Sequence, residues 1–399
     1  MPTSTYFDKY PPFPSNIPVA NVPIFSFLKL AVNDEHESFA LFEASRHIGF
    51  FQLDFTGCSF GDQFLKNTET MFNLNTELYA LSKTELNKYA YSPPVSLFRY
   101  FNLHNSSLQF QNLYSPIEVS TNRSLVMFRY KPLGYHKIGK IGDRVELYGI
   151  SRDDITGASE PLANPSCIER CRPQLKTYIE QANEIVNNIL GHLEKHLKLP
   201  LGTFSQLQPM TEPSGSVLRM LKYEPQPPDD RRTAMMGHTD ITTLTLLFST
   251  TGGLQILNDD ADPHLESSWT HIKPQPSTCI VNLGDAMVEW TGGILRSAMH
   301  RVTSPPGDQS SMTRYVVGYF ARPAGDSLMK RLAPPEYPFS LVSPVKEPEN
   351  SGNDMNARDW EWHKLSSVKA GNMGGSLGGK PFEQKRDLNE LFPVVVDAA

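Results

Sequence analysis

Cysteine is scarce in this sequence, and long apolar runs are absent. The 399 residues include four cysteines, and no two of them have C-x-x-C spacing, which argues against a disulfide framework or a cysteine-based metal site. No apolar run is long enough to span a membrane, and the proline-rich N-terminus lacks the apolar segment of a signal peptide. We therefore expect a reduced, cytoplasmic protein without a membrane partner.

An excess of positive charge is also missing. With 37 Lys and Arg against 43 Asp and Glu, the formal net charge is -6, so the sequence has no electrostatic footprint for nucleic acid. The apolar content of 39% and the charged content of 20% are typical of an ordinary globular protein. Proline is abundant, with 32 residues, which favours many loops and argues against a mainly helical fold.

Two potential metal ligands lie two residues apart, ahead of a β-branched and apolar run. His238 and Asp240 begin the segment His-Thr-Asp-Ile-Thr-Thr-Leu-Thr-Leu-Leu-Phe. Side chains at i and i+2 of a strand point to the same face, so the imidazole and the carboxylate would aim at a common point. His300, at the predicted start of another strand, is the best candidate for a third ligand. Two histidines and one carboxylate leave positions open on the metal, as non-haem Fe(II) requires to bind substrate and O₂ together.

The His-x-Asp pair also has a simpler interpretation, because this tripeptide occurs often by chance. Taken alone, His238 could be a hydrogen-bonded core histidine, and Asp240 a turn or cap residue. The sequence on both sides of the pair reverses this preference.

That surrounding sequence resembles the 2-oxoglutarate/Fe(II)-dependent dioxygenases of the isopenicillin N synthase-like group. The order and spacing of seven short motifs fit the group, and a weaker match extends over most of residues 20–330. The motifs are His238-Thr-Asp240, Leu244-Thr-Leu-Leu, Gly252-Gly-Leu-Gln-Ile256, Val281-Asn-Leu-Gly-Asp285, Trp290-Thr-Gly-Gly, Ser297-Ala-Met-His300-Arg-Val302 and Arg314-Tyr315.

The resemblance implies roles for five residues. His238, Asp240 and His300 would be the iron ligands, and Arg314 and Tyr223 would bind the co-substrate 2-oxoglutarate. A planar guanidinium suits that role because it holds a carboxylate with two parallel hydrogen bonds. The implied enzyme is an oxidoreductase that uses Fe(II), 2-oxoglutarate and O₂ to hydroxylate, desaturate or rearrange a small organic molecule. Many members of the group act on secondary metabolites.

The chain departs from the family pattern at two positions. The family usually has a serine where this chain has Val316, and often an asparagine where it has Leu221. Neither replacement can donate a side-chain hydrogen bond to 2-oxoglutarate. Two alternatives therefore stay open: an Fe(II) oxidase of the same fold that does not use 2-oxoglutarate, and a binding protein that has lost catalysis.

Three further residues are candidates for contact with the organic substrate. Arg219 shares a strand face with Tyr223 by the period of two, and could hold an acidic or phenolic substrate or belong to a structural ion pair. Phe320 shares a face with Arg314, and the family often has an aromatic residue there that stacks on the substrate. Arg322 continues the same face toward the mouth of the site.

The predicted architecture is mainly β with flanking helices and a double-stranded β-helix (jelly-roll) core. Short β-branched runs alternate with Gly, Pro and Asp turns from 217 to 320, as in an antiparallel double-sheet barrel. The expected parts are an extended N-terminal arm (1–20), a mixed α/β region (21–200), the catalytic jelly roll (201–330) and a partly flexible C-terminal extension (331–399).

Local patterns predict helices over 35–48, 61–86 and 172–199, loops over 89–122, and a short helix around Trp360 and Trp362. Asp285 is expected in a turn. His192 and His196 are four apart in the third helix and could bind zinc, but a solvated helix end is the preferred interpretation.

Overall fold

The computed structural model describes residues 3–90, 129–135, 137–138, 141–226, 233–259, 261–332 and 355–369. The loops predicted for 89–122 lie outside these ranges after position 90, as does most of the predicted C-terminal extension. The division of the chain into four parts stays a prediction. Within the N-terminal arm there is one turn of helix, α1 (Ser4–Phe7).

Two antiparallel sheets form the centre of the molecule. The larger has the strand order β1-β2-β12-β9-β14-β7-β6-β3, in which β1 and β2 are parallel, and the smaller has the order β11-β10-β13-β8. The larger sheet consists of β1 (Ile24–Ser26), β2 (Phe50–Asp54), β3 (Tyr130–Lys131), β6 (Val145–Ser151), β7 (Val217–Tyr223), β9 (Leu244–Ser249), β12 (Thr278–Leu283) and β14 (Arg314–Phe320). The smaller consists of β8 (Met235–His238), β10 (Leu254–Leu257), β11 (Trp269–His271) and β13 (His300–Val302). A separate hairpin pairs β4 (Lys137–Ile138) with β5 (Ile141–Gly142).

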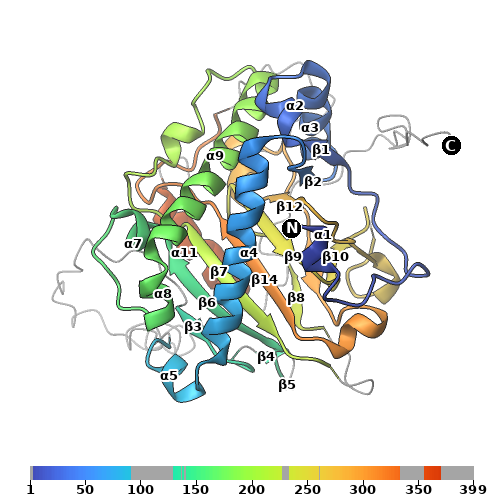
Figure 1. Ribbon diagram of the computed structural model, residues 1–399. Coiled ribbons are helices and arrows are strands. Elements are labelled where there is room, and N and C mark those ends of the chain that lie inside the picture. The colour runs from blue at the N-terminus through green and yellow to red at the C-terminus, as the bar shows by residue number, and fades with distance from the viewer. Residues whose placement is uncertain are drawn as a thin grey trace, which may run out of the picture.

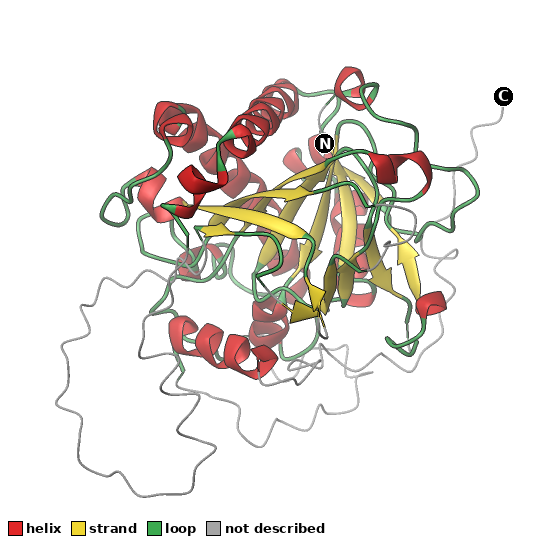
Figure 2. Cartoon of the chain, turned by 90° about the horizontal axis from the view of Figure 1, so that it is seen from below, coloured by secondary structure: helices red, strands yellow, loops and turns green. Residues whose placement is uncertain are grey.

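Helices cover the outer face of the larger sheet. In Figure 1, α4 (Ser59–Ala80) and α9 (Arg172–Leu197) lie in front of β7, β9 and β14, and Figure 2 shows the strands in the interior with helices around them. The other α-helices among the described residues are α2 (Phe27–Ala31), α3 (Glu35–His47), α5 (Lys83–Asn87), α7 (Arg152–Thr156), α8 (Ser166–Arg170), α10 (Asp285–Thr291) and α11 (Ala357–Lys369). The expectation of a mainly β protein with flanking helices is confirmed.

The apolar stripe predicted for the third helix is the buried face of α9. All nine of its members are buried: Leu175, Tyr178, Ile179, Ala182, Ile185, Val186, Ile189, Leu190 and Leu193. The helix has a proline in its first turn and ends at Leu197, and the following cap residue, Lys198, has a φ of 56°. This stripe packs α9 against α3 and α4, because a helix gains most of its stability by burying such a face.

Two local predictions need correction, and a third is confirmed. The helix expected over 61–86 is divided into α4 and α5, because Leu81 is extended and the Ser82 hydroxyl caps α5 by accepting from the N–H of Glu85. Asp285 is the first residue of α10 and not a turn residue. Around Trp360 and Trp362 the structure has α11, as predicted.

The two helical histidines both contact α3, and His192 is buried while His196 is half-buried. His192 is 4% exposed; its Nδ1 lies 2.9 Å from the Ser38 hydroxyl and its Nε2 lies 3.0 Å from the carbonyl of Leu30. His196 Nε2 lies 2.9 Å from the same hydroxyl. The prediction of a solvated helix end is therefore wrong, because both rings bind α3 to α9 through one serine.

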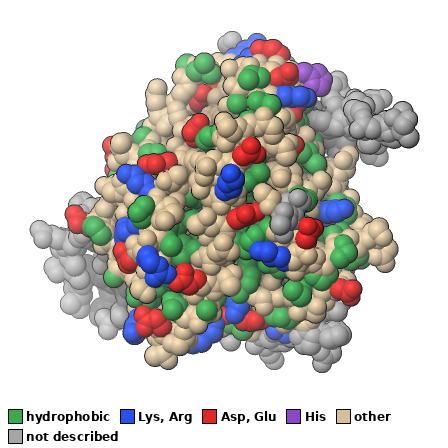
Figure 3. Space-filling model, viewed as in Figure 1, with side chains coloured by type: hydrophobic (Ala, Val, Ile, Leu, Met, Phe, Trp, Pro, Cys, Tyr) green, Lys and Arg blue, Asp and Glu red, His purple; other side chains and the backbone are tan. Residues whose placement is uncertain are grey.

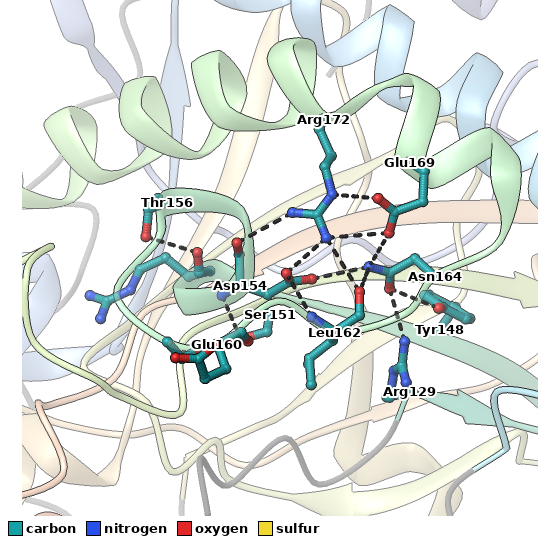
Figure 4. A network of polar contacts seen from close by, with 12 residues as sticks. Arg129, Tyr148, Ser151, Asp154, Thr156, Glu160, Leu162, Asn164, Glu169 and Arg172 are labelled. Atoms are coloured by element: carbon teal, nitrogen blue, oxygen red, sulfur yellow. Dashed lines mark hydrogen bonds and ion pairs between the residues drawn. The ribbon is translucent and has the colours of Figure 1, made fainter. Parts of the chain in front are cut away.

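The loop between α7 and α8 is held by a buried polar network (Figure 4). Asn164 lies at its centre, and Arg172 of α9 bridges Asp154 and Glu169. The Asn164 side chain accepts from Arg129 and Tyr148, and donates to Asp154, the Leu162 carbonyl and Glu169, all at 2.9–3.3 Å. The network satisfies groups that would otherwise be buried without partners.

None of the helices among the described residues is both long and apolar enough to cross a membrane. On the helical face of the molecule, basic and acidic side chains are interspersed without a patch of one sign (Figure 3). The four cysteines are free.

Asn164→Ala should lower the free energy of unfolding by about 2–4 kcal/mol, because it removes several buried hydrogen bonds at once. Ser159→Ala, in the same loop, is the control, since the Ser159 hydroxyl makes one long hydrogen bond of 3.4 Å. Urea denaturation measures both changes. Equal stability of the two variants would contradict the structural role of the network.

Candidate active site

The structure brings His238, Asp240 and His300 together between the two sheets. Strands β8 and β13 pair antiparallel with His300 directly opposite His238, and the two ring centroids are 4.4 Å apart. Asp240 follows β8 by two residues, and its Oδ1 lies 3.9 Å from His238 Nε2. One ligand atom from each residue can be chosen so that all three lie within 4.8 Å of one another. This separation suits a single metal ion.

Both imidazoles are oriented by hydrogen bonds from the nitrogen that points away from the cluster. His238 Nδ1 lies 2.9 Å from the Met236 carbonyl, and His300 Nδ1 lies 3.2 Å from the Ala298 carbonyl. A carbonyl can only accept, so Nδ1 carries the proton and Nε2 keeps its lone pair for a metal. Burial and the neighbouring His238 lower the pKa of His300 to about 4, which keeps its ring neutral near pH 7.

Asp240 is clamped through one of its two oxygens. Its Oδ2 accepts from Thr245 of β9 and from the Asn282 amide of β12, each at 2.8 Å. Burial alone would raise the pKa of Asp240, but His300, His238 and the two hydrogen bonds lower it. The carboxylate is therefore ionised, with Oδ1 free to face the histidines.

Arg314, at the start of β14, is a buried cation without a carboxylate partner in the described part of the chain. It is 2% exposed, and its Nε donates to the Gly252 carbonyl at 2.8 Å. Its Nη1 is buried without a hydrogen-bond partner among the described residues. Tyr223 of β7 lies opposite in the strand register, with its ring centroid 4.7 Å from the guanidinium carbon. Burial lowers the pKa of Arg314, and Tyr223 opposes this. A buried guanidinium with an unpaired N–H fits an anionic ligand.

Comparison with known proteins identifies the family. Residues 214–323 match the model of the 2OG-Fe(II) oxygenase superfamily. A 2-oxoglutarate-dependent dioxygenase of Aspergillus fumigatus is 28% identical over 90% of this chain and 89% of its own length. Another, iboH of Amanita muscaria, is 32% identical over 40% of this chain and 76% of its own length. The chain belongs to the 2-oxoglutarate/Fe(II)-dependent oxygenases.

The fold agrees with this family. A crystal structure of a Neurospora crassa protein in complex with alpha-KG and thymine has a TM-score of 0.59 at 19% identity, covering 87% of this chain and 97% of that one. The expected jelly-roll core is thereby confirmed. As a member of the family, this chain is an oxidoreductase, a dioxygenase that uses Fe(II), 2-oxoglutarate and O₂. The His-Asp-His cluster and the unpaired N–H of Arg314 fit the iron and the co-substrate.

The two departures from the family pattern lie side by side in this oxygenase. Val316 and Leu221 are opposite each other in the register of β14 and β7, and both are buried. Asn75 of α4 donates to the backbone carbonyls of both residues, at 3.0 and 3.3 Å. Their apolar side chains lie two residues along the strands from Arg314 and Tyr223, respectively.

Two of the three candidate substrate residues, Arg219 and Arg322, are cations, and the third, Phe320, packs on Arg219. Arg219 is half-buried and has no carboxylate partner among the described residues; its guanidinium carbon lies 4.4 Å from the centroid of the Phe320 ring. Burial and the nearby Arg322 lower the pKa of Arg219 to about 10, while Asp240 raises it. Arg322 itself donates to the buried Glu361 of α11 at 3.2 Å. The structure thus gives Arg322 an acidic partner that sequence reasoning had not found.

Sequence reasoning also missed the residues that support the cluster. Asn282 and Thr245 lie within motifs that carried the family resemblance, but nothing in their spacing links them to Asp240. Asp285 donates its backbone N–H to the Asp240 carbonyl at 2.7 Å, and its side chain lies 3.4 Å from Lys364 of α11. The match of Val281-Asn-Leu-Gly-Asp285 to the family was the available signal.

Gly284→Ala should lower the free energy of unfolding by about 1–3 kcal/mol, because the new Cβ would lie 2.2 Å from the Thr242 carbonyl oxygen. That contact belongs to the segment that holds Asp240. Gly191→Ala is the control: nothing lies within 4 Å of its added Cβ, and alanine should stabilise α9 by about 0.5–1 kcal/mol. Urea denaturation should give shifts of opposite sign, and two shifts of the same sign would contradict the packing.

Proposed function

We propose that His238, Asp240 and His300 hold Fe(II) in this dioxygenase. The observation that carries the proposal is the convergence of two Nε2 atoms and one carboxylate oxygen, while the remaining polar atom of each side chain is already hydrogen-bonded. Each side chain therefore keeps one free ligand atom, directed at a common point. The site combines an anionic ligand with two neutral ones, leaving positions for co-substrate and O₂.

Arg314 and Tyr223 would bind 2-oxoglutarate. Support comes from the buried guanidinium, whose Nε is held by the Gly252 carbonyl and whose Nη1 is unpaired among the described residues. A distal carboxylate would give that N–H a partner and offset the cost of the buried charge. Val316 and Leu221 contribute apolar surface in place of the family's two polar contacts, so Arg314 supplies most of the polar recognition of the co-substrate.

When bound, Fe(II) and 2-oxoglutarate supply the oxidising chemistry, in which the co-substrate is decarboxylated to succinate and an organic substrate is oxidised. The residues of this chain do the positioning. The β8–β13 pairing aims the histidines, Thr245 and Asn282 keep the free oxygen of Asp240 directed at them, and Arg314 fixes the end of the co-substrate.

The substrate would be a small organic molecule with an anionic or strongly polar group, and a secondary metabolite is the proposed class. Arg219 supports this, because a cation stacked on Phe320 without a carboxylate partner among the described residues can bind an anion beside a flat apolar surface. Arg322 would add positive potential, reduced by Glu361. The Neurospora crassa protein of similar fold was crystallised in complex with thymine, a small organic molecule, which supports a small-molecule role. Hydroxylation is the proposed outcome; desaturation and rearrangement use the same site.

An anaerobic titration tests the metal and co-substrate roles. Metal-free protein is given Fe(II) and then 2-oxoglutarate, and a visible charge-transfer band should need both additions. His238→Ala should abolish the band through loss of iron. Arg314→Gln should keep the iron and weaken 2-oxoglutarate binding by at least about tenfold, because a charged bidentate contact is lost. Arg170→Gln, at an exposed residue paired with Glu77, is the control.

The alternatives give other results in the same titration. Iron binding without the band would favour an oxidase that does not use 2-oxoglutarate, and substrate turnover without succinate release would establish it. A protein that binds no Fe(II) would be a binding protein that has lost catalysis. An unchanged band in His238→Ala would remove this residue from the ligand set.

We expect small carboxylic acids to stimulate succinate formation in the wild-type protein. Arg219→Met should reduce this stimulation by about tenfold or more, since the acid loses its cationic partner. The dissociation constant of 2-oxoglutarate, from the titration above, should stay within about twofold. Arg170→Gln again is the control. Equal stimulation in Arg219→Met and wild type would show that the substrate does not depend on this arginine.

A further inference from the structure

The described part of the N-terminal arm, residues 3–20, lies against the turn that holds Arg314. Its beginning is fixed on α4, where the N–H and hydroxyl of Thr3 donate to Glu69 at 2.9 and 2.6 Å. Tyr6 is buried against Phe72 of the same helix, with ring centroids 5.6 Å apart. The end of the arm is fixed on the smaller sheet, where Ala20 N–H donates to the His271 carbonyl at 2.8 Å.

Between these anchors, Gln309 connects the arm to the co-substrate arginine. Its side-chain N–H donates to the Pro11 carbonyl at 2.8 Å, and its side-chain oxygen accepts from Gly252 N–H at 2.9 Å. The Gly252 carbonyl in turn accepts from Arg314 Nε at 2.8 Å. Gln309 is 3% exposed, so water competes little for these bonds. The chain of contacts therefore runs from Pro11 through Gln309 and Gly252 to the guanidinium.

The arm also confines the turn sterically. A Cβ added to Gly252 would lie 2.8 Å from the Phe13 ring and 2.8 Å from Pro306. The next residue, Gly253, has a φ of 108°, a conformation that L side chains rarely adopt. Two consecutive glycines give a turn little conformational preference of its own. Its geometry then depends on what packs against it, and Phe13 and Gln309 are two of those contacts.

We propose that the N-terminal arm positions Arg314 and thereby sets the affinity for 2-oxoglutarate. Phe13 and Gln309 are positioning residues: they hold the Gly252 carbonyl where it orients the guanidinium, and they do not touch the co-substrate. The inference rests on the proposed role of Arg314. Because coupling between two sites is reciprocal, bound 2-oxoglutarate must also stabilise the docked arm.

Two variants separate the arm from the arginine. Gln309→Met keeps the length of the side chain and removes both hydrogen bonds, and Phe13→Ala removes the half-buried ring. Leu201→Ala, at a side chain that is 76% exposed, is the control. The anaerobic titration should give a dissociation constant for 2-oxoglutarate that is roughly tenfold higher in Gln309→Met and several-fold higher in Phe13→Ala. In the double variant, the loss of 2-oxoglutarate binding free energy should be smaller than the sum of the two single losses, because both substitutions act on Gly252.

Hydrogen exchange of the arm provides a measurement that is independent of turnover. Adding 2-oxoglutarate to the Fe(II) protein should slow exchange of the arm amides in the wild type and in Leu201→Ala, and not in Gln309→Met. At saturating 2-oxoglutarate, the turnover of Gln309→Met and Phe13→Ala should stay within about twofold of the wild-type value. The substitutions should therefore change the KM for 2-oxoglutarate and not kcat. The affinity for Fe(II) should be unchanged in all variants.

The outcomes distinguish this inference from the proposed function. Suppose that Arg314→Gln weakens 2-oxoglutarate binding, and that hydrogen exchange shows the arm to be released in Gln309→Met and Phe13→Ala. If these two variants then bind 2-oxoglutarate as tightly as the wild type, the arm has no positioning role. If Arg314→Gln leaves the affinity unchanged, the role of Arg314 fails and the inference fails with it. A loss of Fe(II) affinity in Phe13→Ala would mean general disruption and would also overturn the inference.

Discussion

The pairing of β8 with β13 is the constraint on which the rest of the site depends. It places His238 opposite His300 across one register position, and a strand shifted by one residue would turn every side chain to the other face. Asp240 follows on the chain and is bonded to Thr245 and Asn282 of the larger sheet, which joins the two sheets at this point. The cluster therefore depends on the packing of the whole barrel and not on one strand.

A second constraint is the number of cations placed in the interior. Arg314 is buried without a carboxylate partner in the described part of the chain, Arg219 is half-buried on Phe320, and Arg322 is balanced by Glu361. Buried charge that is not paired is costly, and such groups concentrate where an anionic ligand completes them. Binding of 2-oxoglutarate and substrate would thus stabilise the fold as well as enable the chemistry.

The N-terminal arm and α11 are distant in sequence from the catalytic motifs, and both support the site. Phe13 of the arm packs on Gly252, and α11 contributes Glu361 and Lys364, which contact Arg322 and Asp285. Sequence reasoning assigned the arm and the tail no role in the site, because their residues match no spacing rule. It also expected His192 and His196 to be solvated, since a helical pattern does not reveal which second helix covers it.

The sequence by itself determined most of the secondary-structure elements and the type of chemistry. The period of two placed Arg219 with Tyr223 on β7, and the stripe of α9 fixed its buried face. The same period also predicted His238 and Asp240 on one strand, but β8 ends at His238 and Asp240 follows the strand. These are local properties, encoded within a few residues. Only the tertiary structure decided which groups share a partner: Asn282 with Asp240, Gln309 with Gly252, Glu361 with Arg322. Such contacts join residues far apart in the chain, and their geometry arises only when the sheets and helices pack, so no local pattern could predict them.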